Sequence, residues 1–413
     1  MGICVKVRPV RRGEPQRVIA RRQGLAPCFS PQVPHMPRPI CATIHPDAIR
    51  HNLAAIKAHA PDSRVWAVIK ANAYGHGIAN VFEAMRAADG LAMLDLAEAQ
   101  LVRELGWRGP ILLLEGAFEP RDLELCSRLD LWHVVHNEAQ IDWLATHKTH
   151  VGHRVFLKLN SGMNRLGFAP NAFRSAWSRL NALAQVEEIS LMTHFSDADG
   201  PAGIQAQLAR YLQATDGITG AHCLANSAAV LRHLNGSEQT GGVVVPADWV
   251  RGGIALYGSA PDYPLHSAAH WGLQPAMTLR STLIAIQSLQ AGDAVGYGST
   301  FRAPQAMRIG VVACGYADGY PRHASNQEAG APVLVQGVRT HTLGRVSMDM
   351  LAVDLTPCEA AGVNLDVFES EVVLWGRSTH GAVLCADEVA RASQTIAYEL
   401  FCAVAPRVRL AVD

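Results

Sequence analysis

The sequence predicts an α/β protein in which a (β/α)₈ barrel is followed by a C-terminal domain made mainly of β-strands. The first observation is a series of short apolar runs that alternates with stretches of helical periodicity up to about residue 270. The second is a change after Gln274, beyond which β runs follow one another, separated by glycine and proline. The length of 413 residues suits a barrel with a smaller partner domain.

The composition argues against several classes of function. Lysine plus arginine and aspartate plus glutamate each total 36, so the formal net charge is zero and no basic footprint for nucleic acid is visible. No apolar run approaches the roughly 18 residues of a membrane span. The nine cysteines are scattered and contain no C-x-x-C pair, which indicates reduced thiols and a cytoplasmic protein. We therefore expect no nucleic-acid partner and no membrane partner.

The first 35 residues differ from the rest of the chain. Residues 1–35 are rich in proline and carry seven basic residues against a single acid, Glu14. This basic, aperiodic composition predicts a disordered extension, and it lacks the apolar core of a secretory signal. We expect Met36 to be the true start of the chain. A basic tail that touches an acidic partner is the alternative.

The predicted elements begin with a short strand at 40–44, which belongs either to the barrel domain or to the β domain. A helix at 46–60 follows, because proline is favoured in the first helical turn and Ile49, Leu53 and Ile56 recur on one face. The apolar runs that predict the eight barrel strands lie at 65–69, 90–94, 111–114, 132–135, 154–159, 189–193, 220–224 and 248–251. In a barrel of parallel strands, chemistry lies at the carboxyl ends of the strands.

The predicted barrel domain covers residues 36–270, and the predicted β domain covers residues 271–413. The β runs of the second domain lie at 277–289, 308–314, 332–335, 339–343, 348–355 and 371–374. A helical turn at 387–392 and a final strand at 407–412 close the chain.

The most informative stretch is residues 67–77, with the sequence AVIKANAYGHG. It begins as the apolar run of a buried strand and ends that run on Lys70. An ammonium group buried there costs free energy unless the amine is paired or covalently bound. Gly75 and Gly77 allow a tight turn into the next helix. From its position alone, Lys70 is either a Schiff-base amine or a lysine that reaches the rim of the barrel.

Polar residues also follow four other predicted strands. They are Lys158 and Arg165 near the end of the fifth strand, His194 at the end of the sixth, Asn226 and Ser227 after the seventh, and Arg251 at the end of the eighth, where Gly253 and Ile254 follow. A single histidine at a strand end is more often a packed core residue, and a single arginine is more often half of a salt bridge. Four such stretches on the same rim as Lys70 indicate a site.

These stretches resemble the motifs of the alanine racemases, in that family's order. The stretch around Lys70 resembles the lysine motif for pyridoxal 5′-phosphate (PLP), and the later barrel motifs are LKLNSGMNRLG, THF, ANSAA and RGGIALYG. The β domain adds GYGSTF, GYADGY, GRVSMD and AYEL. The resemblance covers about residue 36 to the C-terminus. It implies a fold-type III PLP enzyme, a racemase of the isomerase class.

The resemblance also implies a role for each residue. Lys70 forms the Schiff base with PLP and is one catalytic base, and Tyr297 is the other. The residues implied to hold the phosphate are Tyr74, Ser227, Tyr398, Gly253 and Ile254. The residues implied near the ring are Arg165, His194 and Arg251, and Asn226 is implied to bind the cofactor. Arg165, Met348 and Asp349 are implied to bind substrate, and in the family Tyr297, Met348 and Asp349 come from the partner subunit of a homodimer.

Physical reasons support the implied roles of Arg251 and Tyr297, and also the carbamylation that the resemblance implies for Lys158. A permanently protonated Arg251 at the pyridine nitrogen keeps that nitrogen unprotonated, which weakens PLP as an electron sink and suits brief proton removal and return. Lys158 beside Arg165 brings two cations together, so we expect Lys158 to be carbamylated or offset by a bound anion. Tyr297 needs a pKa lowered by nearby cations to act as a base near neutrality.

The implied function is two-base racemisation of L- and D-alanine, which supplies D-alanine, for example for cell-wall peptidoglycan. A racemase with a broader range of amino acids is the nearest alternative. A decarboxylase of the same barrel type and a non-catalytic PLP carrier fit less well, because they do not account for the β-domain motifs with Tyr297. A metal hydrolase is disfavoured, since the 18 histidines include no H-E-x-x-H cluster, and we predict no metal.

Overall fold

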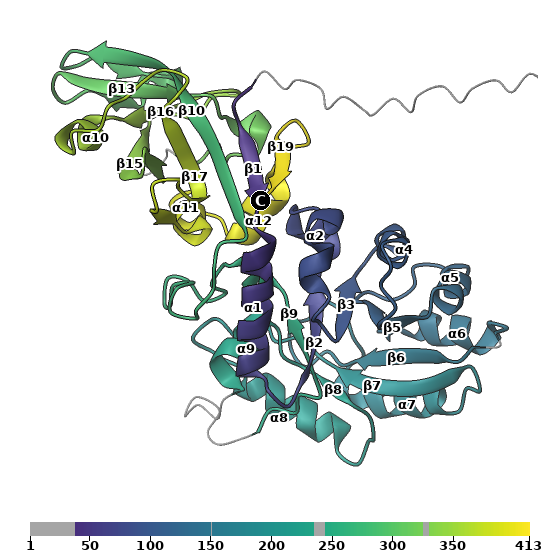
Figure 1. Ribbon diagram of the computed structural model, residues 1–413. Helices are drawn as coiled ribbons and strands as arrows, with labels where there is room; N and C mark the ends of the chain where they lie inside the picture. Colours follow the sequence, from purple (N-terminus) through teal and green to yellow (C-terminus); the bar gives the residue numbers. More distant parts are fainter. Residues whose placement is uncertain (1–37, 150, 235–243, 325–329) are drawn as a thin grey trace, which may run out of the picture. The chain divides into compact units, whose positions relative to one another are not determined.

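The barrel is an eight-stranded sheet in which every paired strand is parallel to its neighbours (Figure 1). In a computed structural model of the chain, residues 38–149, 151–234, 244–324 and 330–413 are described. The predicted extension at 1–35 lies outside the described residues. The strands are β2 (Arg64–Val68), β3 (Gly90–Met93), β4 (Ile111–Leu113), β5 (Leu131–Val135), β6 (His153–Lys158), β7 (Val186–Met192), β8 (His222–Cys223) and β9 (Trp249–Gly252). All eight correspond to predicted strands, although β8 is shorter than predicted.

The order of the strands runs from β8 through β7, β6, β5, β4, β3 and β2 to β9. The Arg251 N–H of β9 donates to the carbonyl of Ala225, just beyond β8, over 2.9 Å. This hydrogen bond joins the two ends of the sheet at the rim. Inside the barrel, the rings of Trp66 and Trp249 stack with their centroids 4.2 Å apart, and both are buried. These indoles fill the barrel interior, so the open space lies at the carboxyl ends of the strands.

Helices connect the strands. They are α1 (Pro46–His59), α2 (Lys70–Tyr74), α3 (Ile78–Val81), η1 (Phe82–Met85), α4 (Leu96–Glu104), α5 (Asp122–Arg128), α6 (Glu138–Thr146), α7 (Pro170–Asn181), α8 (Gln205–Thr215), α9 (Ser227–His233) and η3 (Ile254–Tyr257). Pro46 opens α1, as predicted. Asp95, Asn137 and Asn226 begin α4, α6 and α9 as side-chain caps, because each accepts a backbone N–H of the first turn.

The β domain contains a nine-stranded sheet with the order β18-β17-β14-β15-β16-β13-β10-β1-β19 and a further pairing of β17 with β10. Its strands are β1 (Cys41–Ile44), β10 (Met277–Leu289), β13 (Met307–Val312), β14 (Pro332–Val335), β15 (Val338–Leu343), β16 (Leu351–Asp354), β17 (Glu371–Arg377), β18 (Val383–Leu384) and β19 (Arg409–Val412). A two-stranded sheet pairs β11 (Ala294–Val295) with β12 (Phe301–Arg302). The short helices are η4 (Tyr297–Ser299), η5 (Tyr316–Asp318), α10 (Thr356–Ala360), α11 (Ala386–Ala392) and α12 (Ala397–Ala403).

The strand predicted at 40–44 belongs to this second sheet. As β1, it pairs antiparallel with β10 and parallel with β19, which resolves the alternative left open by the sequence. The predicted run at 348–355 is partly wrong, because only its second half forms β16, while residues 347–350 form a turn closed by the Ser347 N–H and the Met350 carbonyl. The domain limits at residues 35 and 270 stay predictions. In the part of the chain that the structure describes, every helix is too short or too polar to cross a membrane.

Candidate active site

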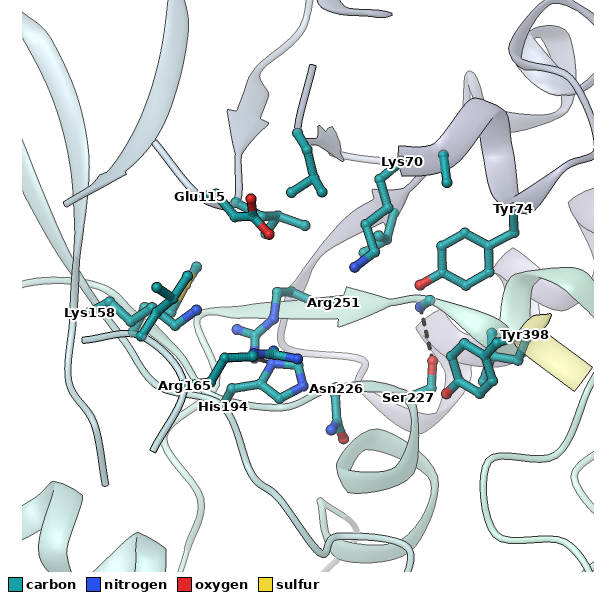
Figure 2. Close-up of a pocket in the computed structure, with 18 of the residues that line it drawn as sticks. Lys70, Tyr74, Glu115, Lys158, Arg165, His194, Asn226, Ser227, Arg251 and Tyr398 are labelled. Atoms are coloured by element: carbon teal, nitrogen blue, oxygen red, sulfur yellow. Dashed lines mark hydrogen bonds between the residues drawn. The ribbon is translucent and has the colours of Figure 1, made fainter. Parts of the chain in front are cut away.

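A pocket opens at the carboxyl ends of the barrel strands, with a cavity volume of about 400 Å³ (Figure 2). Residues from eight separate segments line it, which explains why no single motif describes the site. The predicted residues in its lining are Lys70, Tyr74, Lys158, Arg165, His194, Asn226, Ser227, Arg251, Gly253, Ile254 and Tyr398. These side chains therefore meet at one rim of the barrel, as their positions at the strand ends predict.

Lys70 stands directly after β2, at the start of an unusual turn. Residues 71–74 all have positive φ, between 50° and 54°, although none of them is glycine. This left-handed region is unfavourable for L-residues, so such a run needs outside support. The N–H of Asn72 donates to Glu98 over 2.7 Å, and the Asn72 side chain accepts from the Ile78 N–H over 2.9 Å. These bonds fix the direction in which the backbone leaves Lys70.

Burial lowers the pKa of the Lys70 amine, and the nearby Arg165 guanidinium lowers it further. The neutral form, which is the nucleophilic and basic form, is therefore more populated than in an exposed lysine.

The turn after Lys70 leads into the next helix as the sequence predicts. Gly75 and Gly77 have positive φ, and α3 starts at Ile78.

Arg251 is held by backbone carbonyls at the ends of the strands. Its side chain is buried, and its Nη1 donates to the carbonyl of Cys223 over 2.7 Å. Its Nη2 donates to the carbonyls of Thr193 and Leu224 over 2.9 and 2.8 Å. The same Nη2 lies 3.3 Å from Nδ1 of His194. Because guanidinium is always a donor, Nδ1 of His194 is the acceptor of that contact.

His194 is a neutral imidazole in this setting. Burial, followed by the positive charges of Arg251 and Arg165, lowers its pKa well below the usual value. Lys158 responds to the same environment: burial, then Arg251 and Arg165, lower the pKa of its amine to about 8. Five basic side chains thus share one pocket, among them Lys158 and Arg165, whose motif spacing led us to expect them together.

Glu115 is a pocket residue that the sequence did not identify. It follows β4, and among the described residues that line the pocket it carries the one carboxylate. The backbone carbonyl of Glu115 accepts from Nε2 of His136 over 3.1 Å. The next residue, Gly116, has a positive φ, and a Cβ built on it would lie 2.0 Å from the Val134 carbonyl, so the turn needs a glycine. In Figure 2 its carboxylate points into the cavity, as the Lys70 and Lys158 amines do. The only available signal was an acid beside a glycine after a predicted strand.

Three hydroxyl groups form the opposite side of the pocket. We call Tyr74, Ser227 and Tyr398 the hydroxyl cluster (Figure 2). The Gly253 N–H donates to Ser227 Oγ over 2.9 Å, and a Cβ at Gly253 would lie 3.2 Å from the Tyr74 hydroxyl. Burial raises the pKa of both tyrosines, so the two phenols remain protonated donors. Hydroxyl groups beside the backbone N–H of a loop suit a phosphate.

Asn226 lies beside this cluster, but its side chain has a structural role. Its Oδ1 accepts the Ala229 N–H over 3.0 Å as the cap of α9, and its amide nitrogen lies 3.4 Å from the Phe195 carbonyl. Any contact that Asn226 makes with a ligand is additional to these bonds.

The chain matches two family models over most of its length. The model described as "Alanine racemase, N-terminal domain" matches residues 44–261, and "Alanine racemase, C-terminal domain" matches residues 276–412. The chain belongs to the alanine racemase family. This finding confirms the resemblance that the sequence motifs predicted.

Named alanine racemases are similar to nearly the whole chain. An alanine racemase of Acidovorax sp. (strain JS42) is 66% identical over 378 residues, which are 92% of this chain and 100% of that protein. One from Leptothrix cholodnii is 66% identical over 90% of this chain and 97% of the relative. The crystal structure of biosynthetic alanine racemase from Pseudomonas aeruginosa is 43% identical, with a TM-score of 0.82 over 91% of this chain and 99% of that chain. These neighbours confirm the predicted barrel and β domain.

Three residues that the alanine racemase motifs assign to the site lie outside the pocket of this chain. Tyr297, at the start of η4, is 71% exposed, and Met348 is 53% exposed. The Asp349 carboxylate accepts from Arg407 over 2.7 Å. The structure brings together the residues implied to bind PLP, with Arg165 among them. It leaves the implied second base, Tyr297, and the implied substrate contacts Met348 and Asp349 outside this pocket.

Proposed function

We propose that this protein is a PLP-dependent enzyme that interconverts L- and D-alanine. The observation that carries the proposal is the shared pocket of Lys70, Arg251 and the hydroxyl cluster at the carboxyl ends of the barrel strands. Relatives named as alanine racemases at about 65% identity support alanine as the substrate. D-alanine made in this way would serve peptidoglycan synthesis.

The residues present fit PLP at both ends of the molecule. Tyr74, Ser227 and Tyr398 offer hydroxyls for a phosphate, and the loop at Gly253 and Ile254 lies beside them. The Gly253 N–H donates to Ser227 Oγ in this structure and would have to turn to a phosphate instead. The absence of a side chain at Gly253 keeps that corner open, since a Cβ would crowd the Tyr74 hydroxyl. When bound, PLP supplies an aldehyde that bonds to an amine and a ring that withdraws electrons from the substrate α-carbon.

Each of these pocket side chains then has a defined task. Lys70 would hold the cofactor through its amine, and the same amine would take or return the α-proton on one face, which its lowered pKa favours. Arg251 keeps a fixed positive charge towards the ring, and its carbonyl contacts hold it in place. His194 and Asn226 lie beside it. Arg165 holds the substrate carboxylate by charge.

We propose that the enzyme is a homodimer in which the partner completes the site. Racemisation needs a base on each face of the planar carbanion, and of the two bases that the family motifs assign, Lys70 lies in the pocket and Tyr297 lies outside it. The exposure of Tyr297, Tyr316, Met348 and Met350 supports burial of these side chains against a second copy. Tyr297 is then the second base, and Met348 and Asp349 form the segment that meets the substrate.

Lys158 is proposed to carry a carbamate. Its amine attacks carbon dioxide, forms a nitrogen–carbon bond and releases a proton, so the product is an anion. The lowered pKa of about 8 supports the neutral amine that this addition needs. A carbamate between Arg165 and Arg251 would replace repulsion with attraction. The alternative is an ion pair between Lys158 and the Glu115 carboxylate, which would offset the charge of Lys158 without a carbamate.

The protein is proposed to act in the cytoplasm. The described cysteines, including Cys41, Cys126 and Cys223, are free thiols, which supports a reducing compartment.

The experiment that tests this function is a racemisation assay with the purified protein and PLP. Pure L-alanine should yield D-alanine, detected by a D-amino-acid oxidase, and L-serine and L-arginine should yield far less. Equal rates with all three would favour a broad-specificity racemase. No product from L-alanine, despite bound PLP, would overturn the proposal.

A further inference from the structure

A buried carboxylate in the β domain is shared by two arginines from distant parts of the chain. Asp318, at the end of η5, is fully buried. Arg38 Nη2 donates to one of its oxygens over 3.0 Å, and Arg407 Nε donates to the other over 2.7 Å. The Gly315 N–H donates to the carboxylate as well, over 2.9 Å. Such a charge requires these partners, because an unpaired buried carboxylate is costly.

Both arginines extend beyond Asp318 to the same second residue. Arg407 Nη2 donates to the Asp349 carboxylate over 2.7 Å, and Arg38 Nη2 donates to the Asp349 carbonyl over 3.0 Å. We call Arg38, Asp318, Asp349 and Arg407 the arginine clamp. Its two positive and two negative charges balance.

The sheet register explains how the two arginines reach one point. β1 and β19 are parallel neighbours, with Cys41 opposite Arg409. Arg38 lies three residues before Cys41, and Arg407 lies two residues before Arg409. Both side chains therefore leave the same end of the same strand pair.

The clamp joins two backbone segments that already lie against each other. The N–H groups of Tyr316 and Ala317 donate to the carbonyls of Ser347 and Met348 over 3.1 and 2.9 Å. A Cβ at Gly315 would lie 2.3 Å from the Met348 carbonyl, so the approach leaves no space for a side chain. Arg38 binds the next carbonyl, that of Asp349. The carbonyls of Ser347, Met348 and Asp349 are therefore all hydrogen-bonded.

The same segment leaves a donor open. Among the residues that the structure describes, the Met348 N–H has no hydrogen-bond acceptor. Arg345, two residues before the segment, packs against the turn that carries Tyr297, since a Cβ at Gly298 would lie 2.6 Å from the Arg345 guanidinium. The clamp thus fixes one side of a segment whose other side is exposed.

We propose that Arg38 and Arg407 are positioning residues, which hold segment 347–349 so that it presents Met348 to the substrate in the partner's pocket. The inference rests on the proposed function. It assigns the Asp349 carboxylate to anchoring this segment through Arg407, in place of the direct substrate contact that the sequence implied. Arginine suits the task because its planar fork can bridge two acceptors, which a lysine ammonium does poorly.

The test is to replace Arg407→Met in the full-length holoenzyme, with Arg409→Met as the matched control. Arg409 lies two residues away, and its guanidinium contacts Cys41 Sγ at 3.6 Å. In Arg407→Met, KM for alanine should rise by about tenfold or more, with a smaller fall in kcat, because the segment loses its alignment. Arg409→Met should keep the parent KM and melting temperature. Arg407→Met should melt lower, because the buried Asp318 carboxylate loses one of its partners, but both variants should keep the parent cofactor absorbance.

Amide hydrogen exchange gives a second readout that does not depend on activity. The Tyr316 and Ala317 amides should exchange faster in Arg407→Met than in Arg409→Met, because their carbonyl acceptors are released. This result would support the clamp even if the protein failed to racemise alanine, so the two failures are distinguishable.

Arg38→Met provides an independent check if Arg407→Met does not fold. It removes the bond to the Asp349 carbonyl while Arg407 still pairs with Asp318, so its KM and exchange should change in the same direction. Unchanged KM and exchange in a folded Arg407→Met or Arg38→Met variant, or equal changes in Arg409→Met, would overturn the proposal.

Discussion

Arg251→Met separates the structural role of the pocket arginine from its electrostatic role. The substitution keeps an unbranched apolar stem and removes the guanidinium. Three carbonyls at the strand ends then lose their donor, those of Cys223, Thr193 and Leu224. The cofactor ring also loses the fixed positive charge proposed to face it.

The structure sets the expected size of the effect. Each buried carbonyl left without a donor costs about 1–3 kcal/mol, and pocket water can reach the strand ends, so the low end applies and the sum is about 3 kcal/mol. The unfolding entropy of a chain of this length is about 0.9 kcal/mol/K. The melting temperature should therefore fall by about 3 °C.

Differential scanning calorimetry of the holoenzyme measures this fall, with Arg154→Met as the control. Arg154 is also a barrel arginine, but its partners Asp130 and Glu187 are exposed carboxylates, and such pairs contribute about 1 kcal/mol or less. Arg251→Met should also lose most of its racemisation rate. If Arg251→Met had the melting temperature of the parent and Arg154→Met had a lower one, the contacts with the three carbonyls would not be what anchors Arg251.

Three further predictions follow from the site and the core. Tyr297→Phe should keep PLP bound and lower the racemisation rate by about 10²-fold or more. In deuterated water, the variant should still exchange the α-hydrogen of D-alanine, far better than that of L-alanine. Equal exchange from both isomers would remove Tyr297 from the mechanism. Carbon-13 NMR with labelled bicarbonate should give a carbamate signal that Lys158→Met abolishes, whereas an unmodified ammonium at Lys158 would refute carbamylation. Burial lowers the pKa of His133 to about 3 and that of His153 to about 4, so the unfolded chain binds more protons than the folded chain below pH 6.5. The free energy of unfolding should therefore fall by about 1.4 kcal/mol per pH unit per histidine as the pH drops towards 4. His133→Leu should flatten this slope in acid-denaturation curves, and an unchanged slope would contradict the prediction.

The strand-end residues could be predicted because a parallel barrel imposes their meeting point. Lys70, His194, Ser227 and Arg251 each follow an apolar run, and the barrel brings the ends of those runs to one rim. Their mutual contacts, such as the bond between Arg251 and His194, depend on side-chain directions that the strand pattern does not contain.

Other features depend on contacts across hundreds of residues or on rare backbone geometry. The arginine clamp joins Arg38 to Asp349, 311 residues apart, and no local pattern marks that pair. The left-handed run at 71–74 contains no glycine, so composition argues against it. Glu115 reaches the pocket because Gly116 turns the chain after β4, and the apolar pattern of that strand gives no sign of it.

The most direct test of the central claim is to identify which lysine bonds to the cofactor. Lys70 and Lys158 line the same pocket, but Lys70 lies on the side of the hydroxyl cluster in Figure 2. The holoenzyme is reduced with borohydride, digested and analysed by mass spectrometry, while its absorbance near the violet edge of the visible range is recorded before and after reduction. The account predicts that this band disappears and that the pyridoxyl mass is found on the peptide containing Lys70. A label on Lys158, or a folded PLP-treated protein with no labelled lysine, would contradict it.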